Sequence, residues 1–393
     1  MEITGSDKLN KIGGYAFDEV NKIVAKLKEE GVTPIDFGVG DPSAPTPEFV
    51  RNAVKEALGT YSKAGYPSYV GQKEYRQAVS KWMEKRFGIE INSETEICST
   101  IGSKEAVFHF PQAFINDGDI VILPNPGYPP MKTGTIFAGG IPYFVSLKEE
   151  NNFLLDYKSI PENIAEKAKI IWINYPNSPT GVCANREYYE GLINWAHKHD
   201  IIIAADEGCY IDIYFEEKPI SILEVAREGV ITFYSLSKRN NMTGYRVGWV
   251  AGDERIVEKF KKLKTNIDSG TADFIQAGAI SALEDETHAK EMRNEYKEKR
   301  EVMLEAFKQV GWTDCKSEAT FYLWLKTPKG LKSVEFAKQL LSKEVAVVVT
   351  PGAWISDVDK DGFNPGENYV RFALVPPLLK VKEAVERIKK FYK

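Results

Sequence analysis

The stretch ITFYSLSKRNNMTGYRVGWV, residues 231–250, places a lysine at the end of an apolar, strand-like run. Ser235 and Ser237 flank the end of this run. Lys238 follows directly, and Arg246 opens a second apolar segment. Taken alone, a lysine in such a pattern is more often a surface cation. The alternative is an amine in a pocket, where Lys238 forms a Schiff base with a phosphorylated carbonyl compound while Ser235 and Arg246 bind the phosphate.

The composition of the 393-residue chain is that of an ordinary globular protein with a large core. Hydrophobic residues make up 43%, the formal net charge is −5, and no basic tract favours nucleic acid. The sequence contains no run of about 18 apolar residues, so we predict no membrane span. The N-terminal sequence is charged and unlike a secretion signal. The four cysteines and four histidines are too scattered for a disulfide framework or a metal site. We therefore predict a cytoplasmic protein without a metal, a membrane or nucleic acid as partner.

Apolar strand-like segments alternate with helix-like segments, such as 73–87 and 186–199, through the middle of the chain. This alternation predicts an α/β fold with a mostly parallel sheet covered on both faces. In such sheets, ligands bind beyond the carboxyl ends of the strands. Five signals lie at or just beyond predicted strand ends and are expected to meet at one edge: Gly102, Tyr128, residues 176–181, Asp206 and Lys238.

Two glycine-containing turns offer backbone N–H groups to an anion. At Gly102-Ser103-Lys104, a strand-like segment runs directly into a helix, whose N-terminal N–H groups and serine hydroxyl form an anion site. The alternative is an ordinary capping serine. Gly40 follows a short strand and either offers its N–H to a carboxylate or forms a plain tight turn.

The C-terminal part of the chain predicts a smaller α+β domain. Residues 319–326, 345–352 and 368–375 are strand-like and alternate with helices. The last of these segments carries Arg371 between apolar neighbours, where a charged side chain needs a partner. Arg371 either pairs with a buried carboxylate or binds a substrate carboxylate through two hydrogen bonds.

Several ordered motifs resemble those of the fold-type I, pyridoxal-phosphate-dependent class I/II aminotransferases. SLSKRNNMTGYRVGW is similar to the family's lysine motif, NYPNSPTG to its N-P-x-N-P-T-G turn, ADEGCY to its D-E-x-Y segment, and GSKEA to its phosphate-binding helix start. The resemblance covers essentially the whole chain and implies a large domain with a mostly parallel seven-stranded sheet. It divides the chain into an N-terminal arm with part of the small domain (1–45), a large cofactor-binding domain (46–284) and a small C-terminal domain (285–393).

The resemblance implies a role for each candidate residue. Lys238 is expected to form the Schiff base with pyridoxal 5'-phosphate and to move the proton. Asp206 is expected to pair with the pyridinium nitrogen, and Tyr210 to donate to the phenolate oxygen. A homodimer with active sites at the subunit interface is also implied. The remaining roles are phosphate binding by Ser103, Lys104, Ser235, Arg246 and the neighbouring subunit's Tyr66, ring stacking by Tyr128, and substrate carboxylate binding by Arg371 and Gly40.

Two departures from the family pattern affect the contact to the phenolate oxygen. Ser178 stands where the family usually has an asparagine, and we expect this shorter donor to contact the cofactor while the adjacent Asn177 serves the substrate. The acidic segment also carries one extra residue. We expect Gly208 to form a bulge that keeps Tyr210 in its family position; the alternative puts Cys209 there.

The resemblance implies ping-pong transfer of an amino group between an amino acid and a 2-oxo acid. FGVGDPSAPTP, LKTNIDSGT and SKRNNMTGYRVGWVAG are most similar to the diaminopimelate aminotransferases of lysine biosynthesis, which act on LL-diaminopimelate or its succinylated form. Alternatives are an aspartate or broad-specificity aminotransferase and a C–S lyase on the same fold. A non-catalytic regulator is the third alternative, and the intact Lys238, Asp206 and Arg371 speak against it.

Overall fold

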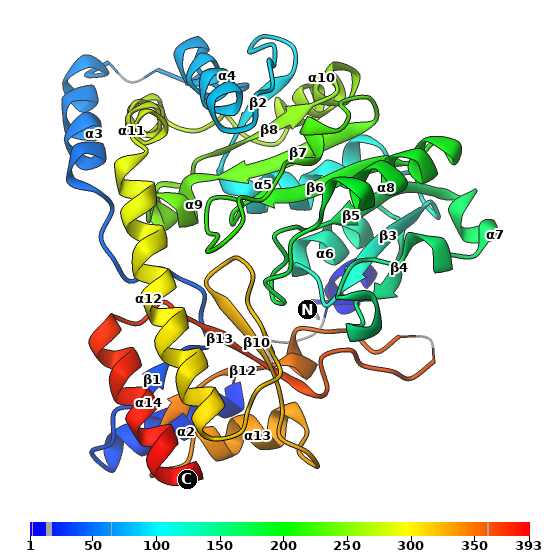
Figure 1. Cartoon of the computed structure of the whole chain (residues 1–393). Helices are drawn as coiled ribbons and strands as arrows, with labels where there is room; N and C mark the ends of the chain where they lie inside the picture. The colour runs from blue at the N-terminus through cyan, green and yellow to red at the C-terminus, as the bar shows by residue number, and fades with distance from the viewer. Residues whose placement is uncertain (2, 13–17, 64, 360) are drawn as a thin grey trace.

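The computed structural model describes residues 1, 3–12, 18–63, 65–359 and 361–393 (Figure 1). Its centre is a seven-stranded sheet in the order β2-β8-β7-β6-β5-β3-β4. β8 runs antiparallel to both of its neighbours, and the other strands are parallel to one another. The prediction of a mostly parallel seven-stranded sheet is therefore confirmed. The strands span Ile97–Thr100 (β2), Ile120–Asn125 (β3), Ile141–Ser146 (β4), Ala168–Ile173 (β5), Ile202–Gly208 (β6), Val230–Ser235 (β7) and Gly248–Gly252 (β8).

Helices cover both faces of this sheet. Along β5, Ile171 and Ile173 pack into one apolar core, whereas Ile170 and Trp172 pack into another on the opposite face. Helices α4, α8 and α11 contribute to the first core, and α5, α6 and α10 to the second. The central strands β5, β6 and β7 are mostly apolar because both of their faces are buried. The helices span Lys73–Phe87 (α4), Gly102–His109 (α5), Pro129–Phe137 (α6), Arg186–Lys198 (α8), Glu254–Lys264 (α10) and Asp273–Glu284 (α11).

A third core lies below the large sheet in Figure 1, and residues from both ends of the chain contribute to it. Ile35 and Phe37 pack there with Phe321 and Phe372, although almost the whole sequence separates them. A four-stranded sheet in the order β12-β13-β10-β9 and the long helix α12 frame this core. The elements are Cys315–Lys316 (β9), Tyr322–Lys326 (β10), Thr350–Pro351 (β12), Tyr369–Ala373 (β13), Thr287–Gln309 (α12), Ser333–Leu340 (α13) and Leu378–Tyr392 (α14).

The segment 345–352, predicted as one strand, forms two short strands in different sheets. β11 (Val347–Val348) pairs in parallel with β1 (Ile35–Asp36), whereas β12 pairs antiparallel with β13. The backbone changes partner at Val349, and the continuous apolar sequence does not reveal this change because both halves are buried. Among the described helices, none combines the length and the apolar character that crossing a membrane requires.

Candidate active site

A cavity of about 470 Å³ lies beyond the carboxyl ends of the central strands, against residues 39–41. It brings together nine of the predicted site residues from six separate stretches of sequence: Gly40, Ser103, Lys104, Tyr128, Ser178, Asp206, Tyr210, Lys238 and Arg246. Seven further residues that the sequence did not single out for the site complete the wall: Val39, Asp41, Asn174, Cys209, Ser237, Thr243 and Tyr322.

Lys238 reaches the cavity from a short helix that begins where β7 ends. The helix α9 (Leu236–Arg239) is capped by Ser235, whose Oγ accepts a hydrogen bond from the Ser237 N–H at 3.1 Å. The Lys238 ammonium donates to the carbonyl oxygen of Gly40 at 2.6 Å. The amine is therefore held at the cavity by a backbone oxygen, which a competing ligand can replace.

Asp206 lies at the end of β6 with a carboxylate that lacks a partner. Its side chain is buried, with the residue only 5% exposed, and Oδ1 has no hydrogen-bond partner among the described residues. Burial raises the pKa of Asp206 to about 7. A buried carboxylate without a donor is costly, so this side of the cavity is suited to a ligand that brings an N–H or a positive charge.

The start of α5 and the Arg246 side chain form an anion-binding corner. The Arg246 guanidinium donates to the carbonyl oxygens of Thr243 at 2.8 Å and Ile101 at 3.4 Å, which fixes it beside the helix N-terminus. A Cβ atom on Gly102 would lie 2.4 Å from Arg246 Nη2, so this close approach requires glycine. The helix N–H groups, the Ser103 hydroxyl and the guanidinium are together suited to a phosphate.

The NYPNSPTG turn uses its two asparagines differently from the prediction. Asn177 is buried inside the turn, where its Oδ1 accepts from the Thr180 N–H at 3.0 Å and the Thr180 hydroxyl at 2.7 Å. Asn177 does not line the cavity, because its amide serves to close the turn; its substrate contact stays a prediction. Asn174 lines the cavity instead, and its Oδ1 accepts from the Ser178 N–H at 2.8 Å.

The bulge in the acidic segment falls at Glu207, and the prediction of Gly208 is wrong. In the β6–β7 ladder, Asp206 pairs with Phe233 and Gly208 pairs with Tyr234, which leaves Glu207 as the extra residue. The Glu207 carboxylate is buried and accepts hydrogen bonds from the Tyr234 hydroxyl at 3.0 Å and the Ile222 N–H at 2.7 Å. These donors hold the extra residue on the side away from the cavity.

Beyond the bulge, both Cys209 and Tyr210 line the cavity. The Tyr210 hydroxyl lies 3.0 Å from the hydroxyl of Tyr322, a residue that the sequence did not indicate. Burial raises the pKa of Tyr210 well above its usual value, so its hydroxyl keeps its proton and remains a donor. Tyr322 was missed because its place depends on a contact to a segment 112 residues away.

Arg371 lies behind Tyr322, outside the cavity wall. Its guanidinium carbon sits 4.4 Å from the centre of the Tyr322 ring, and Nη2 donates to the Gly38 carbonyl oxygen at 2.9 Å and to Thr350 Oγ1 at 3.3 Å. Arg371 Nε is buried without a hydrogen-bond partner within the described part of the chain. The guanidinium thus keeps one unused donor behind Tyr322.

Besides Asn177 and Arg371, two more predicted residues do not reach the cavity of this single chain. Ser235 is buried behind the wall, where its hydroxyl donates to Ser237 Oγ at 2.7 Å, and Ser237 takes the place at the surface. Tyr66 is 87% exposed and contributes nothing to the wall.

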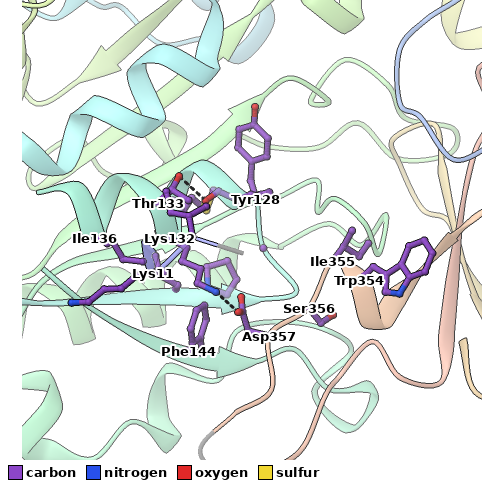
Figure 2. A pocket seen from close by; sticks show the side chains of 16 residues that line it. Lys11, Tyr128, Lys132, Thr133, Ile136, Phe144, Trp354, Ile355, Ser356 and Asp357 are labelled. Atoms are coloured by element: carbon purple, nitrogen blue, oxygen red, sulfur yellow. Dashed lines mark hydrogen bonds and ion pairs between the residues drawn. The ribbon is translucent and has the colours of Figure 1, made fainter. Parts of the chain in front are cut away.

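A smaller cavity of about 240 Å³ adjoins the site at Tyr128 (Figure 2). The Tyr128 ring points away from the other labelled side chains of this cavity (Figure 2). Lys132 and Asp357, from opposite sides of it, form an ion pair with each other. The Asp357 N–H also donates to Asn125 Oδ1 at 2.9 Å. The acid of the smaller cavity, Asp357, is already paired with Lys132, whereas Asp206 Oδ1 in the larger cavity has no hydrogen-bond partner in the described part of the chain. The larger cavity, which also holds Lys238, is therefore the candidate active site.

A lysine amine, a buried carboxylate and an anion corner at the carboxyl edge of an α/β sheet define a transferase site of fold type I. The chain belongs to the family "aminotransferase class I and II", which matches residues 32–388, and it is a transaminase. Over 98% of each chain, it is 46% identical to LL-diaminopimelate aminotransferase from Aquifex aeolicus. It is 43% identical to the enzyme of the same name from Halothermothrix orenii, over 98% of this chain and 97% of that one.

Solved structures have the same fold. A probable N-succinyldiaminopimelate aminotransferase from Thermus thermophilus superposes with a TM-score of 0.85 at 30% identity, over 96% of this chain and 100% of that one. The substrate-bound BacF structure from Bacillus subtilis reaches a TM-score of 0.90 at 32% identity, over 100% and 99% of the two chains.

Proposed function

We propose that the chain is a pyridoxal 5'-phosphate-dependent LL-diaminopimelate aminotransferase of lysine biosynthesis. The observation that carries the proposal is the unpartnered Asp206 carboxylate in the same cavity as the Lys238 amine. The substrate assignment is supported by three relatives with this name that are 46, 43 and 40% identical over nearly the whole chain. Those relatives are more similar to this chain than the succinyldiaminopimelate enzyme at 30% identity.

The residues of the cavity fit the cofactor. Asp206 suits a protonated ring nitrogen, and Ser103, Lys104 and Arg246 suit a phosphate. Tyr128 offers an aromatic face, and Lys238 the amine. When bound, pyridoxal phosphate supplies an aldehyde for the amine and a ring that takes up electrons from the substrate's α-carbon.

The chain's own residues then hold charge and move a proton. Asp206 stays ionised against a protonated ring nitrogen, because the opposite charge offsets the burial that raises its pKa. Lys238 would leave the Gly40 oxygen, and its free Nζ would take up the proton of the substrate's α-carbon and hold it for return later in the reaction. Tyr210 keeps its proton and donates to an oxygen on the ring. The Arg371 guanidinium, behind Tyr322, would bind the substrate carboxylate.

We also propose a cytoplasmic homodimer. Tyr66 is 87% exposed in the single chain, as expected for a residue that completes the phosphate site of a neighbouring subunit. The alternative functions are an aspartate or broad-specificity aminotransferase and a C–S lyase on the same fold. A Thermus thermophilus aspartate aminotransferase mutant superposes with a TM-score of 0.89. Its sequence identity of 25% is far below the 46% of the LL-diaminopimelate aminotransferase from Aquifex aeolicus.

A half-reaction screen tests the proposal. The protein loaded with pyridoxal phosphate is mixed with single amino acids, and the visible absorption band of the cofactor is followed. We expect LL-diaminopimelate to convert the band, succinyl-diaminopimelate and aspartate to convert it more slowly, and Lys238→Ala to slow conversion at least about a thousand-fold. Conversion of the band by aspartate but by no diaminopimelate compound would show that the substrate is aspartate and not diaminopimelate. Release of pyruvate and ammonia in the absence of an added 2-oxo acid acceptor would show that the protein is a lyase.

A further inference from the structure

Cys209 places its sulfur at the anion-binding corner of the active-site cavity. It lines the cavity just beyond the end of β6, and its Sγ lies 3.2 Å from Ser103 Oγ at the start of α5. The two residues come from segments 106 positions apart. The thiol therefore contacts the hydroxyl that is best placed to bind a phosphate at this helix N-terminus.

The direction of this hydrogen bond decides what Ser103 can do. A serine hydroxyl has one proton, which it gives either to the sulfur or to a ligand. Burial raises the pKa of the Cys209 thiol to about 12, so the sulfur keeps its own proton at neutral pH. When the S–H donates to Ser103 Oγ, the serine proton is left for an acceptor in the cavity.

A second feature shows independently that a ligand belongs in this cavity. Asp206 is buried, only 5% of it is exposed, and its Oδ1 has no partner among the described residues. It lines the same cavity as Cys209 and Arg246. An acceptor of N–H groups and a donor set for an anion thus lie in one cavity, as a phosphorylated heterocycle requires.

We propose that Cys209 is a positioning residue of the phosphate site: its S–H donates to Ser103 Oγ and turns the Ser103 hydroxyl toward the cofactor phosphate. The inference rests on the proposed function, because that phosphate is the one on pyridoxal phosphate. Cys209 acts through Ser103, so its effect depends on the serine and on the phosphate.

Two ligands that differ only in the phosphate test this role. Cofactor-free full-length protein is titrated with pyridoxal phosphate or with pyridoxal, and the quenching of tryptophan fluorescence gives the dissociation constant. Cys209→Ala should weaken binding of pyridoxal phosphate about 5- to 10-fold, the size of one lost hydrogen bond between neutral groups, and leave pyridoxal within about twofold. Cys209→Ser keeps a donor and should stay close to the wild type for both ligands.

Two controls separate positioning from a general change in the cavity. Cys183→Ala removes another thiol whose pKa burial raises to about 12 but which lies outside the cavity wall, and it should change neither affinity. In Ser103→Ala protein, adding Cys209→Ala should cause no further loss, because the two residues act as one unit. Equal affinity of wild type and Cys209→Ala for pyridoxal phosphate would overturn the inference, as would an equal loss for both ligands.

Failure of the proposed function gives a different result. The wild type would then bind neither pyridoxal compound. In that case inorganic phosphate is the titrant, and Cys209→Ala should bind it several-fold more weakly than the wild type. Equal phosphate affinity would still overturn the role of Cys209.

Discussion

Gly40 is the residue at which Lys238 and Tyr322, two side chains of the candidate site, meet. Its carbonyl oxygen accepts from Lys238, and a Cβ atom at this position would lie 2.0 Å from the Tyr322 hydroxyl oxygen. Tyr322 cannot move aside freely, because its hydroxyl is hydrogen-bonded to Tyr210. The absence of a side chain at Gly40 therefore sets the positions of both active-site groups.

Gly40→Ala should lower kcat/KM about 100-fold, because a displacement of about 1 Å at a reacting centre has an effect of that size. Steady-state kinetics measures the loss, and thermal unfolding checks that the fold is retained. Gly59→Ala is the matched control: a Cβ there meets nothing within 4 Å, so activity should be unchanged. An unaltered kcat/KM for Gly40→Ala would show that Tyr322 gives way.

Asp206 makes the stability of the cofactor-free protein depend on pH. The unfolded carboxyl loses its proton near pH 3.8, whereas the buried one keeps it to about pH 7. Between these values the folded state binds more protons than the unfolded state, so stability falls as pH rises. Asp206→Asn should remove about 4 kcal/mol of this fall, because one pKa unit corresponds to about 1.4 kcal/mol.

Denaturant titrations of the cofactor-free wild type and Asp206→Asn at several pH values measure this difference. Burial also raises the pKa of Glu207 to about 7, but Glu207 is present in both proteins and its contribution cancels. Above pH 7 the variant should be the more stable protein and yet bind pyridoxal phosphate more weakly. Parallel pH profiles for the two proteins would contradict an unpaired Asp206.

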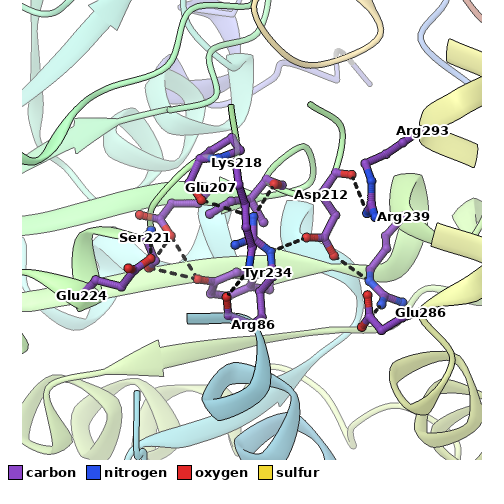
Figure 3. Close-up of polar contacts among 12 residues, drawn as sticks. Arg86, Glu207, Asp212, Lys218, Ser221, Glu224, Tyr234, Arg239, Glu286 and Arg293 are labelled. Atoms are coloured by element: carbon purple, nitrogen blue, oxygen red, sulfur yellow. Dashed lines mark hydrogen bonds and ion pairs between the residues drawn. The ribbon is translucent and has the colours of Figure 1, made fainter. Parts of the chain in front are cut away.

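At the scale of elements, Asp212 ties together three segments around the active site (Figure 3). Its carboxylate accepts from Arg86 Nε on α4 at 2.7 Å and from Arg239 Nε on α9 at 2.7 Å. Burial alone would raise the pKa of Asp212, but the two guanidinium groups outweigh it and hold the pKa below its usual value. Because Arg239 follows Lys238 directly, this bridge also anchors the helix that carries the Lys238 amine.

Asp212→Ala should destabilise the protein by about 3–5 kcal/mol, because it leaves the buried Arg86 guanidinium without a counter-ion and Arg239 with only the partly exposed Glu286. Equilibrium denaturation measures the change. Glu162→Ala is the comparison, since it removes the pairs of an exposed carboxylate with Lys198 and His199 and should change the free energy of unfolding far less. Equal effects of the two substitutions would mean that water replaces the Asp212 bridge.

Periodic apolar sequence was enough to predict the large sheet and helices such as α4, because local burial determines those elements. The bulge at Glu207 was misplaced, since its position depends on donors from Ile222 and Tyr234, which lie outside the acidic segment. Motifs located Lys238 and Asp206. Tyr322 carries no motif and enters the site only through tertiary contacts, so local pattern could not find it.

On the scale of the whole molecule, the site lies where two cores of the chain meet. Lys238 lies beyond the large sheet and donates to Gly40. Gly40 is close to the segment that packs with Phe321 and Phe372 in the third core, below the large sheet. Two hydrogen bonds between the Asn125 amide and the backbone of Asp357, at 2.7 and 2.9 Å, form another contact between the two parts. We propose that these parts correspond to a large domain at 46–284 and a small domain formed by 285–393 with part of 1–45.

The proposed dimer makes each active site depend on two chains, Lys238 from one and Tyr66 from the other. Lys238→Ala and Tyr66→Ala homodimers should both be impaired, the first by at least about a thousand-fold and the second by about 10- to 1000-fold. When the two variants are mixed, dissociated and reassociated, each hybrid dimer has one site with both residues intact. Random pairing makes half of the dimers hybrid, so activity should return to about a quarter of the wild-type value.

Activity measured before and after reassociation gives the result, and each variant treated alone is the control. Recovery shows that Tyr66 serves the neighbouring subunit, because a residue acting within its own chain would leave the hybrid with two damaged sites. The exposure of Tyr66 in the single chain, 87%, is then explained by the site that it completes in its partner. Sedimentation of the mixture must show dimers; an absence of recovery in a dimeric mixture would place Tyr66 outside the shared site.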